Sequence, residues 1–337
     1  MKKTLFSLLA IALAATACNN DGIEYTAKDI RVKTTILGSL TRTGTAEGGG
    51  TVFLDGDQII FYAWDGTPSE NNEPWIKDVV LTKGASDVWT PSTKIYWKTS
   101  KTRHSFIGVY PVGAIDNTQG LENQTYSFIK DTRTDSYSEF TEDLLRAYIT
   151  GQLMDESNDY SITLPFSHAF AMLRVNMNFR NQWEQTPEVE SVEANLANTA
   201  SIDYYTGEVT PYATTRGRLL HETTAANDFK KSFFIVAAPN DKGFNKIVIT
   251  IDGKTFTYNY DPSSLANSSV DDAADNQSIT LKQGYITTIN LVVGRNNINL
   301  DFSGTEGASG ITIDTGQQAQ HITATLSATK NKNECLT

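Results

Sequence analysis

Reactive and metal-binding side chains are scarce in this 337-residue chain, which holds two cysteines and four histidines. The histidines are scattered and form neither a His-x-x-x-His nor a His-Glu-x-x-His pattern. The chain also lacks a Gly-x-Ser-x-Gly elbow, and its Ser, His and Asp residues show no recognised catalytic spacing. We therefore expect no metal, no cofactor and no enzyme activity, and His168, between Phe166 and Phe170, is interpreted as a structural residue.

Positive charge is also scarce, because the chain has 28 Lys and Arg but 39 Asp and Glu, which gives a net charge of −11. Such an acidic chain argues against nucleic acid or an anionic membrane surface as a partner. The acidic loops at 55–57 and 271–275 offer oxygen ligands, but neither fits the EF-hand pattern. Turn chemistry and solvation explain them better than calcium.

Long hydrophobic runs are absent except for one near the start, Leu5 to Ala15, which follows Lys2 and Lys3. It is shorter than the roughly 20 residues of a membrane-spanning helix, so it predicts a cleaved export signal. The next residues, Ala15-Thr16-Ala17-Cys18, resemble the bacterial lipobox, in which the cysteine is diacylated and becomes the mature N-terminus. We expect residues 1–17 to be the signal peptide and Cys18 to carry a lipid anchor in the outer membrane.

Cysteine pairing is excluded if Cys18 is acylated, because Cys335 then has no partner within the chain. Cys335 is the third residue from the end of the sequence given and follows a run of lysines and asparagines, so we expect an exposed tail. Removal of residues 1–17 would take Lys2 and Lys3 with it and change the net charge from −11 to −13.

Short period-two and β-branched runs dominate the chain, with Gly, Asn, Asp and Pro clusters between them. They predict an all-β fold of two tandem antiparallel β-sandwich domains with few short helices, of which Glu139 to Ala147 is the best candidate. A polar linker near residues 150–162 suggests domains at 43–158 and 159–337. The predicted strands are 29–40, 58–64, 94–97, 105–110, 161–164, 173–179, 232–236, 246–251, 254–260, 285–293, 298–302, 310–314 and 321–326.

Several short motifs resemble the fimbrillin family of Bacteroidales pilus subunits. They are a strand that ends in Thr41-Arg42-Thr43 after the lipobox, the runs Gly56 to Trp64 and Lys94 to Trp97, His104 to Pro111, and Leu164 to Val175. The resemblance implies two tandem β-sandwich domains, assembly by exchange of strands between subunits, and a place on the cell surface in a fimbrium. Its implied partners are other fimbrial subunits, of the same chain or of paralogues, and an arginine-specific, trypsin-like protease.

Two segments have the alternation that strand exchange requires. The segment 18–42 is interpreted as removable, and its apolar face comprises Ile30, Val32, Ile36 and Leu40. Near the other end, the candidate donor strand 321–328 presents Ile322, Ala324, Leu326 and Ala328. The polar residues that follow, 330–337, leave open whether the subunit belongs to the stalk or to the tip of a fimbrium.

Maturation in the family is a cut by the protease at a position such as Arg42, and the resemblance points to the Arg42–Thr43 bond. Arg42 follows the alternating strand and precedes a flexible Gly-rich stretch that could enter a protease cleft. Arg31 is a weaker rival, because backbone pairing within a strand would hide its peptide bond.

Two other functions stay open at the level of sequence. A surface lipoprotein that does not polymerise could bind glycans or host proteins, with Trp75 and Trp89 near polar residues as the exposed aromatic pair and Trp64 and Trp97 buried. A glycosidase would need two carboxylates that face a cleft, and nothing singles out such a pair.

Overall fold

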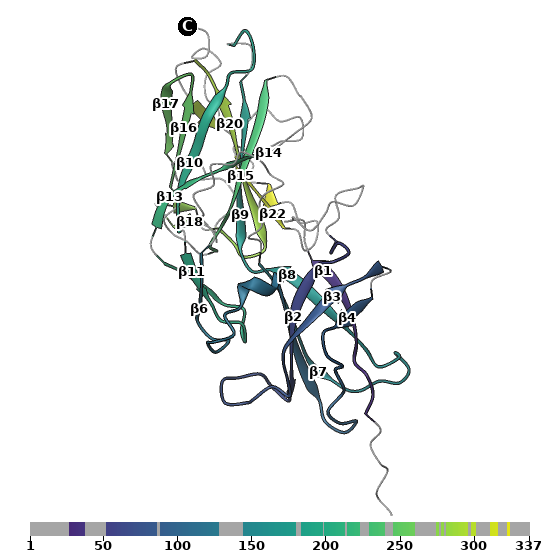
Figure 1. The fold of residues 1–337 in the computed structure, drawn as a ribbon. Coiled ribbons are helices and arrows are strands. Elements are labelled where there is room, and N and C mark those ends of the chain that lie inside the picture. Colours follow the sequence, from purple (N-terminus) through teal and green to yellow (C-terminus); the bar gives the residue numbers. More distant parts are fainter. Residues whose placement is uncertain are drawn as a thin grey trace, which may run out of the picture.

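The structure is a computed structural model in which two β-rich lobes are joined end to end (Figure 1). The described residues include one 3-10 turn, Val112–Ala114, and no α-helix. The all-β fold is therefore confirmed. The structure describes residues 27–37, 52–85, 88–127, 144–179, 183–197, 199–212, 214–222, 229–239, 245–259, 274–275, 278–279, 281–295, 298–300, 311–315 and 322–323.

The first lobe contains one seven-stranded sheet in the order β1-β8-β7-β5-β2-β3-β4. Every neighbouring pair in it is antiparallel except β1 and β8, which run parallel over seven residue pairs. The strands are β1 (Arg31–Leu37), β2 (Gln58–Asp65), β3 (Ile76–Lys83), β4 (Trp89–Pro91), β5 (His104–Tyr110), β7 (Leu145–Gln152) and β8 (Ser161–His168).

Strand β2 is buried on both of its faces, which explains why its sequence is an almost unbroken apolar run. Ile59, Phe61 and Ala63 lie in the core of the first lobe. Ile60 and Trp64, on the opposite face, lie in a second cluster that the two lobes share.

The first sheet curls so that the residues before β1 meet the far edge of the sheet. The N–H of Ile30 donates to the carbonyl of Ile95, and the N–H of Trp97 donates to the carbonyl of Lys28, both at 3.0 Å. Asp29 and Tyr96 form an isolated antiparallel bridge. Residues 28–30 are therefore joined to residues 95–97, which follow β4, while β1 itself pairs with β8.

The second lobe is a sandwich of two sheets around one core. Strands β9, β15 and β20 supply one inner face of that core, and β10 and β16 supply the other. One sheet has the order β13-β10-β16-β17, with strands Thr214–Arg218, Val189–Ala197, Lys246–Ile251 and Lys254–Asn259. The other has the order β14-β15-β9-β20-β22-β23, with strands Leu220–Glu222, Lys230–Ala237, Ala171–Asn178, Tyr285–Val293, Ile311–Thr315 and Ile322–Thr323, and β21 (Ile298–Leu300) also pairs with β20.

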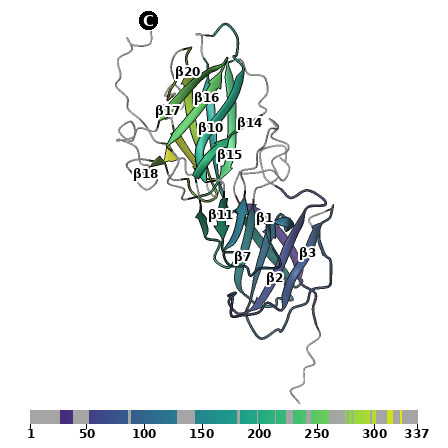
Figure 2. The same ribbon diagram turned by 60° about the vertical axis from the view of Figure 1, so that its left-hand side comes forward.

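A small third sheet connects the two halves of the chain, as the second view of the ribbon shows (Figure 2). Strand β6 (Gln124–Ser127) pairs with β11 (Thr199–Ile202), which in turn pairs with β12 (Val209–Pro211). The shared cluster packs Tyr62 and Val109 of the first lobe together with Ile202 and Phe234 from later in the chain. Strands β18 (Ala274–Asp275) and β19 (Ser278–Ile279) form a separate antiparallel pair.

Three details differ from the sequence-based expectations. The described end of the helix expected at 139–147 lies in strand β7, because Leu145 and Ala147 are buried in alternation with Arg146 and follow the period of a strand. Within the expected strand 94–97, Tyr96 forms only an isolated bridge. Two strand pairs, β1–β8 and β9–β20, are parallel where an antiparallel arrangement was expected.

The polar segment expected to link two domains is the turn between β7 and β8. Its residues, 153–160, connect neighbouring strands of the first sheet, and β8 belongs to that sheet. The chain passes from the first sheet to the second lobe after His168, since Ala171 begins β9.

Candidate functional site

The apolar face expected on the removable segment lies against the core of the first lobe. Ile30 and Val32 are each 5% exposed, and Ile36 packs partly buried against the same core. Arg31, Lys33 and Thr35 on the other face are exposed. Leu40 lies outside the described residues.

We call the surface that holds the segment 28–37 the seat. It is formed by strand β8 on one side and by residues 95–97 on the other. Strand β8 pairs with β1 from Arg31↔Ser161 to Leu37↔Ser167. On the other side the contact is limited to residues 28–30 and 95–97. Strand β8 is therefore the main neighbour of β1, and β1 is an edge strand of the sheet.

Aromatic side chains form the floor of the seat. The indole Nε1 of Trp89 donates to Thr34 Oγ1 at 3.0 Å, and that of Trp97 donates to the carbonyl of Tyr160 at 3.1 Å. Phe53 meets both Trp89 and Phe166 edge to face, with ring centroids 5.2 and 5.1 Å apart. These contacts join β1, β4 and β8 into one packed unit.

The expectation that Trp89 reaches solvent is wrong, because this residue is 5% exposed and hydrogen-bonded to β1. Trp75 is half-buried, and its Nε1 donates to the carbonyl of Tyr96 at 3.1 Å. Trp64 and Trp97 are buried as expected. The aromatic pair proposed for stacking on sugars is therefore not an exposed surface.

One titratable group, His104, lies beside the aromatic floor, and its burial lowers its pKa. His104 is fully buried, with ring centroids 4.9 Å from Trp75 and 5.3 Å from Trp97, and this burial lowers the pKa of His104. Nearby Asp65 opposes that shift, but burial dominates. The imidazole is thus held neutral beside the residues that contact the segment 28–30.

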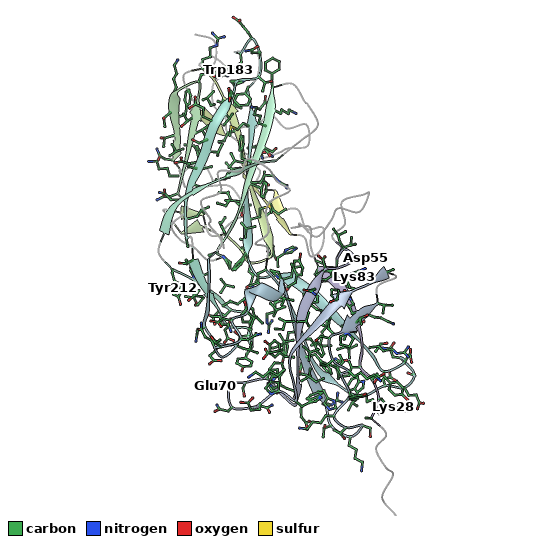
Figure 3. The ribbon with its side chains drawn as sticks, viewed as in Figure 1. Lys28, Asp55, Glu70, Lys83, Trp183 and Tyr212 are labelled. Carbon is green, nitrogen blue, oxygen red and sulfur yellow. The ribbon has the colours of Figure 1, made fainter. Side chains whose placement is uncertain are left out.

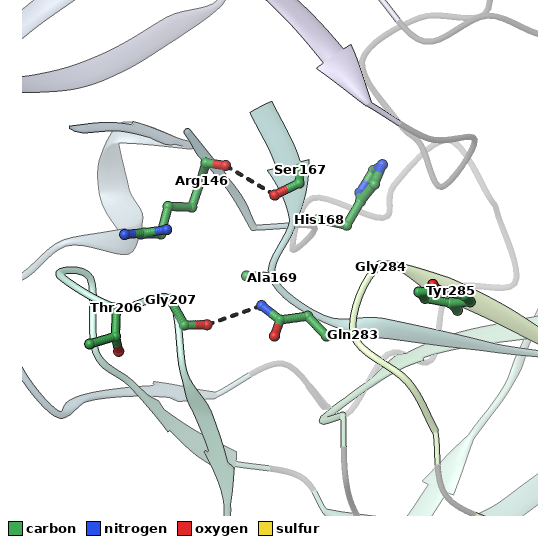
Figure 4. Close-up of a pocket in the computed structure, with 9 residues that line it drawn as sticks. All are labelled: Arg146, Ser167, His168, Ala169, Thr206, Gly207, Gln283, Gly284 and Tyr285. Atoms are coloured by element: carbon green, nitrogen blue, oxygen red, sulfur yellow. Dashed lines mark hydrogen bonds between the residues drawn. The ribbon is translucent and has the colours of Figure 1, made fainter. Parts of the chain in front are cut away.

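A polar pocket of 280 Å³ lies where the two lobes meet (Figure 4). The guanidinium of Arg146 is anchored by the carbonyls of Tyr204 and Tyr205 at 2.8 and 2.6 Å, and burial lowers the pKa of Arg146 to about 10. Gln283 Nε2 donates to the carbonyl of Gly207 at 3.0 Å across the same pocket. Its lining holds no carboxylate, so it offers no acid–base pair of the kind that glycoside hydrolysis needs. The lining residues are Arg146, Ser167, His168, Ala169, Thr206, Gly207, Gln283, Gly284 and Tyr285.

The acidic loop at 55–57 is a turn held by its own side chains. Asp57 Oδ2 accepts the N–H of Leu54 at 2.7 Å, and Gly56 adopts φ +94°, which favours glycine. Lys83 Nζ lies 3.4 Å from Asp55 Oδ1 at the foot of this turn (Figure 3). Among the described residues no group of three His, Cys, Asp or Glu side chains could hold a metal ion.

Several other predicted site residues lie outside the described part of the chain, namely Cys18, Arg42, Thr43, Ala324, Leu326, Ala328 and Cys335. Ile322 is described and pairs with Ile313 as part of β23, at the edge of the second lobe. Within the described residues, no helix is long and apolar enough to cross a membrane.

The sequence-based reasoning missed the partners of the removable segment. It predicted the strand at 161–164 but not its pairing with β1, and it interpreted the polar segment near residues 150–162 as an interdomain linker. A signal for the pairing was present in the alternation of Ile162, Leu164 and Phe166, which are all buried in the same core as Val32.

Comparison with known proteins places this architecture in a family. The model of the family described as Fimbrillin-like matches residues 41–306. A candidate cell adhesion protein from Bacteroides uniformis aligns with a TM-score of 0.56 and 15% identity, over 86% of this chain and 98% of its own. A second, from Bacteroides ovatus, aligns with a TM-score of 0.56 and 14% identity, over 81% and 95%. None of the curated proteins matches the sequence.

The two structural matches show the two-lobed β fold, and the family match extends over more than half of the chain. Fimbrial and adhesion proteins of this kind are structural, located at the cell surface, and not enzymes. The chain belongs to the fimbrillin-like family.

Proposed function

We propose that this protein is a structural subunit of a fimbrium that assembles by strand exchange after a proteolytic cut and thereby supports adhesion. In this proposal the precursor is exported as a lipoprotein, held in the outer membrane through Cys18. An arginine-specific, trypsin-like protease cuts the Arg42–Thr43 bond. The segment 18–42 then leaves with its lipid.

The observation that carries the proposal is the seat of β1. Among the described residues β1 pairs along its length only with β8, and Ile30, just before β1, and Val32 are buried in the core of the first lobe. Its loss would expose an apolar groove over Trp89 and Phe166 and leave the edge of β8 unpaired. A groove of this kind binds an extended strand through main-chain hydrogen bonds and alternating side-chain pockets.

The position of the candidate cut is compatible with release of the whole strand. The last residue of β1 is Leu37, five residues before Arg42, so a cut after Arg42 lies beyond the paired strand. Leu37 itself is 41% exposed, which marks the point where the chain leaves the core. Arg31, the rival site, is paired with Ser161 inside the sheet, and its peptide bond is shielded from a protease.

The candidate donor strand begins at an edge of the second lobe. Within the part of the chain that the structure describes, Ile322 and Thr323 pair with β22, which places the start of the candidate donor strand beside the last strand in the order of this sheet. The partners in assembly would be further copies of this chain or paralogous subunits. For the domains we propose a division after His168, which modifies the expected 43–158 and 159–337 so that β8 stays with the first lobe.

The test is treatment of the lipidated precursor with an arginine-specific protease, followed by sequencing of the new terminus and light scattering. We expect Thr43 as the first new terminus and polymers after the cut. The matched control is Arg42→Lys, which keeps the charge but removes the arginine, and which should stay uncut and monomeric. A first terminus other than Thr43, or a cut protein that stays monomeric, would contradict the proposal.

A further inference from the structure

The turn between β7 and β8 holds the beginning of β1 through two cation contacts. The guanidinium of Arg31 forms an ion pair with the carboxylate of Asp159. The Nζ of Lys28 lies 5.3 Å from the centroid of the Tyr160 ring, over its face. The backbone N–H of Arg31 also donates to the carbonyl of Tyr160 at 3.3 Å. We name residues 155–160 the clasp.

The clasp is held in an unusual conformation. Asp159 and Tyr160 have φ values of +52° and +56°, in the left-handed region that residues other than glycine rarely adopt. The N–H of Tyr160 donates to the carbonyl of Asp155 at 2.9 Å, and Asp155 Oδ1 accepts the N–H of Ser157 at the same distance. Strained backbone of this kind is typical of binding sites, where the surrounding structure holds it in place.

The clasp lies at the end of the first lobe that is remote from the second lobe, where Figure 3 shows Lys28. Trp97 connects it to the floor of the seat, because its Nε1 donates to the carbonyl of Tyr160. The clasp therefore contacts one end of the strand in the seat. If β1 leaves, the carboxylate of Asp159 loses its ion pair with Arg31 and the Tyr160 ring loses the contact with Lys28.

The spacing of β1 occurs a second time in the chain, in reverse. In the segment 28–37, Lys28 precedes four alternating positions that face the seat, of which Ile30 and Val32 are buried. The C-terminal segment has four alternating apolar residues followed, two residues later, by Lys330. The two patterns are Lys28-x-Ile30-x-Val32-x-Thr34-x-Ile36 and Ile322-x-Ala324-x-Leu326-x-Ala328-x-Lys330.

We propose that the clasp selects and orients the strand that replaces β1. Lys330 of a second copy of this chain takes the place of Lys28 over the Tyr160 ring, and the incoming strand runs antiparallel to β8. In the opposite direction Gln320 would occupy that place, and the clasp would face no cation. This inference rests on the proposed strand exchange and deepens it.

The orientation has an energetic consequence. Parallel pairs are slightly less stable per residue than antiparallel ones. Exchange would replace the parallel β1–β8 pair with an antiparallel pair over the same length of β8. The incoming strand thus gains from its direction as well as from its lysine.

Disulfide trapping tests the direction. Leu37 lies opposite Ser167 in the present pairing, so an antiparallel donor places His321 there and a parallel donor places Thr329 there. We would prepare Ser167→Cys with either His321→Cys or Thr329→Cys, both in a Cys335→Ser chain, and cut each with the protease. The expected result is a disulfide-linked ladder from the His321→Cys pair only.

The outcomes separate this inference from the proposed function. If the Cys335→Ser parent assembles and the Thr329→Cys pair is trapped equally well or better, or neither pair is trapped, the orientation is overturned while strand exchange stands. If the cut parent does not assemble at all, both are overturned.

A peptide competition tests the role of Lys330 without any risk to folding. Peptides of residues 319–337 compete with assembly of the cut protein, and we compare Lys330→Gln with its matched control Lys332→Gln, which removes the same charge two residues later. Loss of an exposed cation–π contact predicts about a threefold higher half-inhibitory concentration for Lys330→Gln. Equal values for the two peptides would contradict the assignment of Lys330 to the clasp.

Discussion

Replacement of Ile30 by alanine tests whether β1 is held as firmly as its packing indicates. The side chain is 5% exposed and lies in the core of the first lobe, and its backbone N–H bonds to Ile95. Truncation of such an isoleucine typically lowers the free energy of unfolding by about 2–5 kcal/mol. With a urea dependence of about 2 kcal/mol per molar, a loss of about 3 kcal/mol moves the midpoint down by about 1.5 M.

The assay is urea unfolding of the full chain, followed by tryptophan fluorescence. Four of the five tryptophans lie in the first lobe, so the signal reports mainly on the lobe that holds β1. The matched control is Lys33→Ala on the exposed face of the same strand, which should change stability by no more than about 0.5 kcal/mol. Equal midpoints for the two variants would refute the buried seat of β1.

Three further predictions concern the walls of the same seat. Gly108→Ala should lower stability by about 1–3 kcal/mol in thermal unfolding, because the new Cβ would lie 2.8 Å from Phe166 Cζ. Thr34→Val should cost about 1–3 kcal/mol in urea unfolding, because it leaves the buried Trp89 Nε1 without its acceptor. The lowered pKa of His104 means that the unfolded chain binds a proton more readily, so stability should fall as the pH drops from about 7 to 5, and His104→Gln should reduce that fall.

Each of these variants has a control and a contradicting result. Gly113→Ala meets nothing within 4 Å and should be nearly neutral, so equal effects at Gly108 and Gly113 would contradict close packing of β5 against β8. Thr35→Val, on the exposed face, should leave the midpoint unchanged. An equal loss of stability in Thr35→Val would show that the effect of Thr34→Val does not come from the lost hydrogen bond to Trp89. An unchanged pH profile in His104→Gln would show that another group causes the acid sensitivity.

The sequence predicted the strands well where one face is buried and the other is exposed. Segment 29–40 alternates because its inner face meets the core and its outer face meets solvent, and β1 lies within it. Apolar and β-branched runs also predicted β5, β9, β16 and β20 to within a few residues, although β5 is buried on both faces. It also indicated the family from short motifs, which the family match confirms.

Pairing between distant strands could not be predicted, because nothing local encodes it. The parallel contact of β1 with β8 joins residues more than a hundred positions apart, and their alternation fits either direction. The turn 155–160 resembled a linker because its residues are polar, yet Asp159 and Tyr160 bind the start of β1. Trp89 was wrongly predicted to be exposed because its neighbours in the sequence are polar. Its indole N–H instead donates to the hydroxyl of Thr34, 55 residues away, and no local pattern indicates that contact.

The central claim, that another strand replaces β1, is tested most directly by amide hydrogen exchange of the cut and assembled protein, read by mass spectrometry. In the precursor the edge of β8 from Ser161 to Ser167 is covered by β1. We predict that peptides from β8 stay protected in the polymer although residues 27–37 are gone from the sample. Rapid exchange along β8, or residues 27–37 still bound in the polymer, would contradict strand replacement.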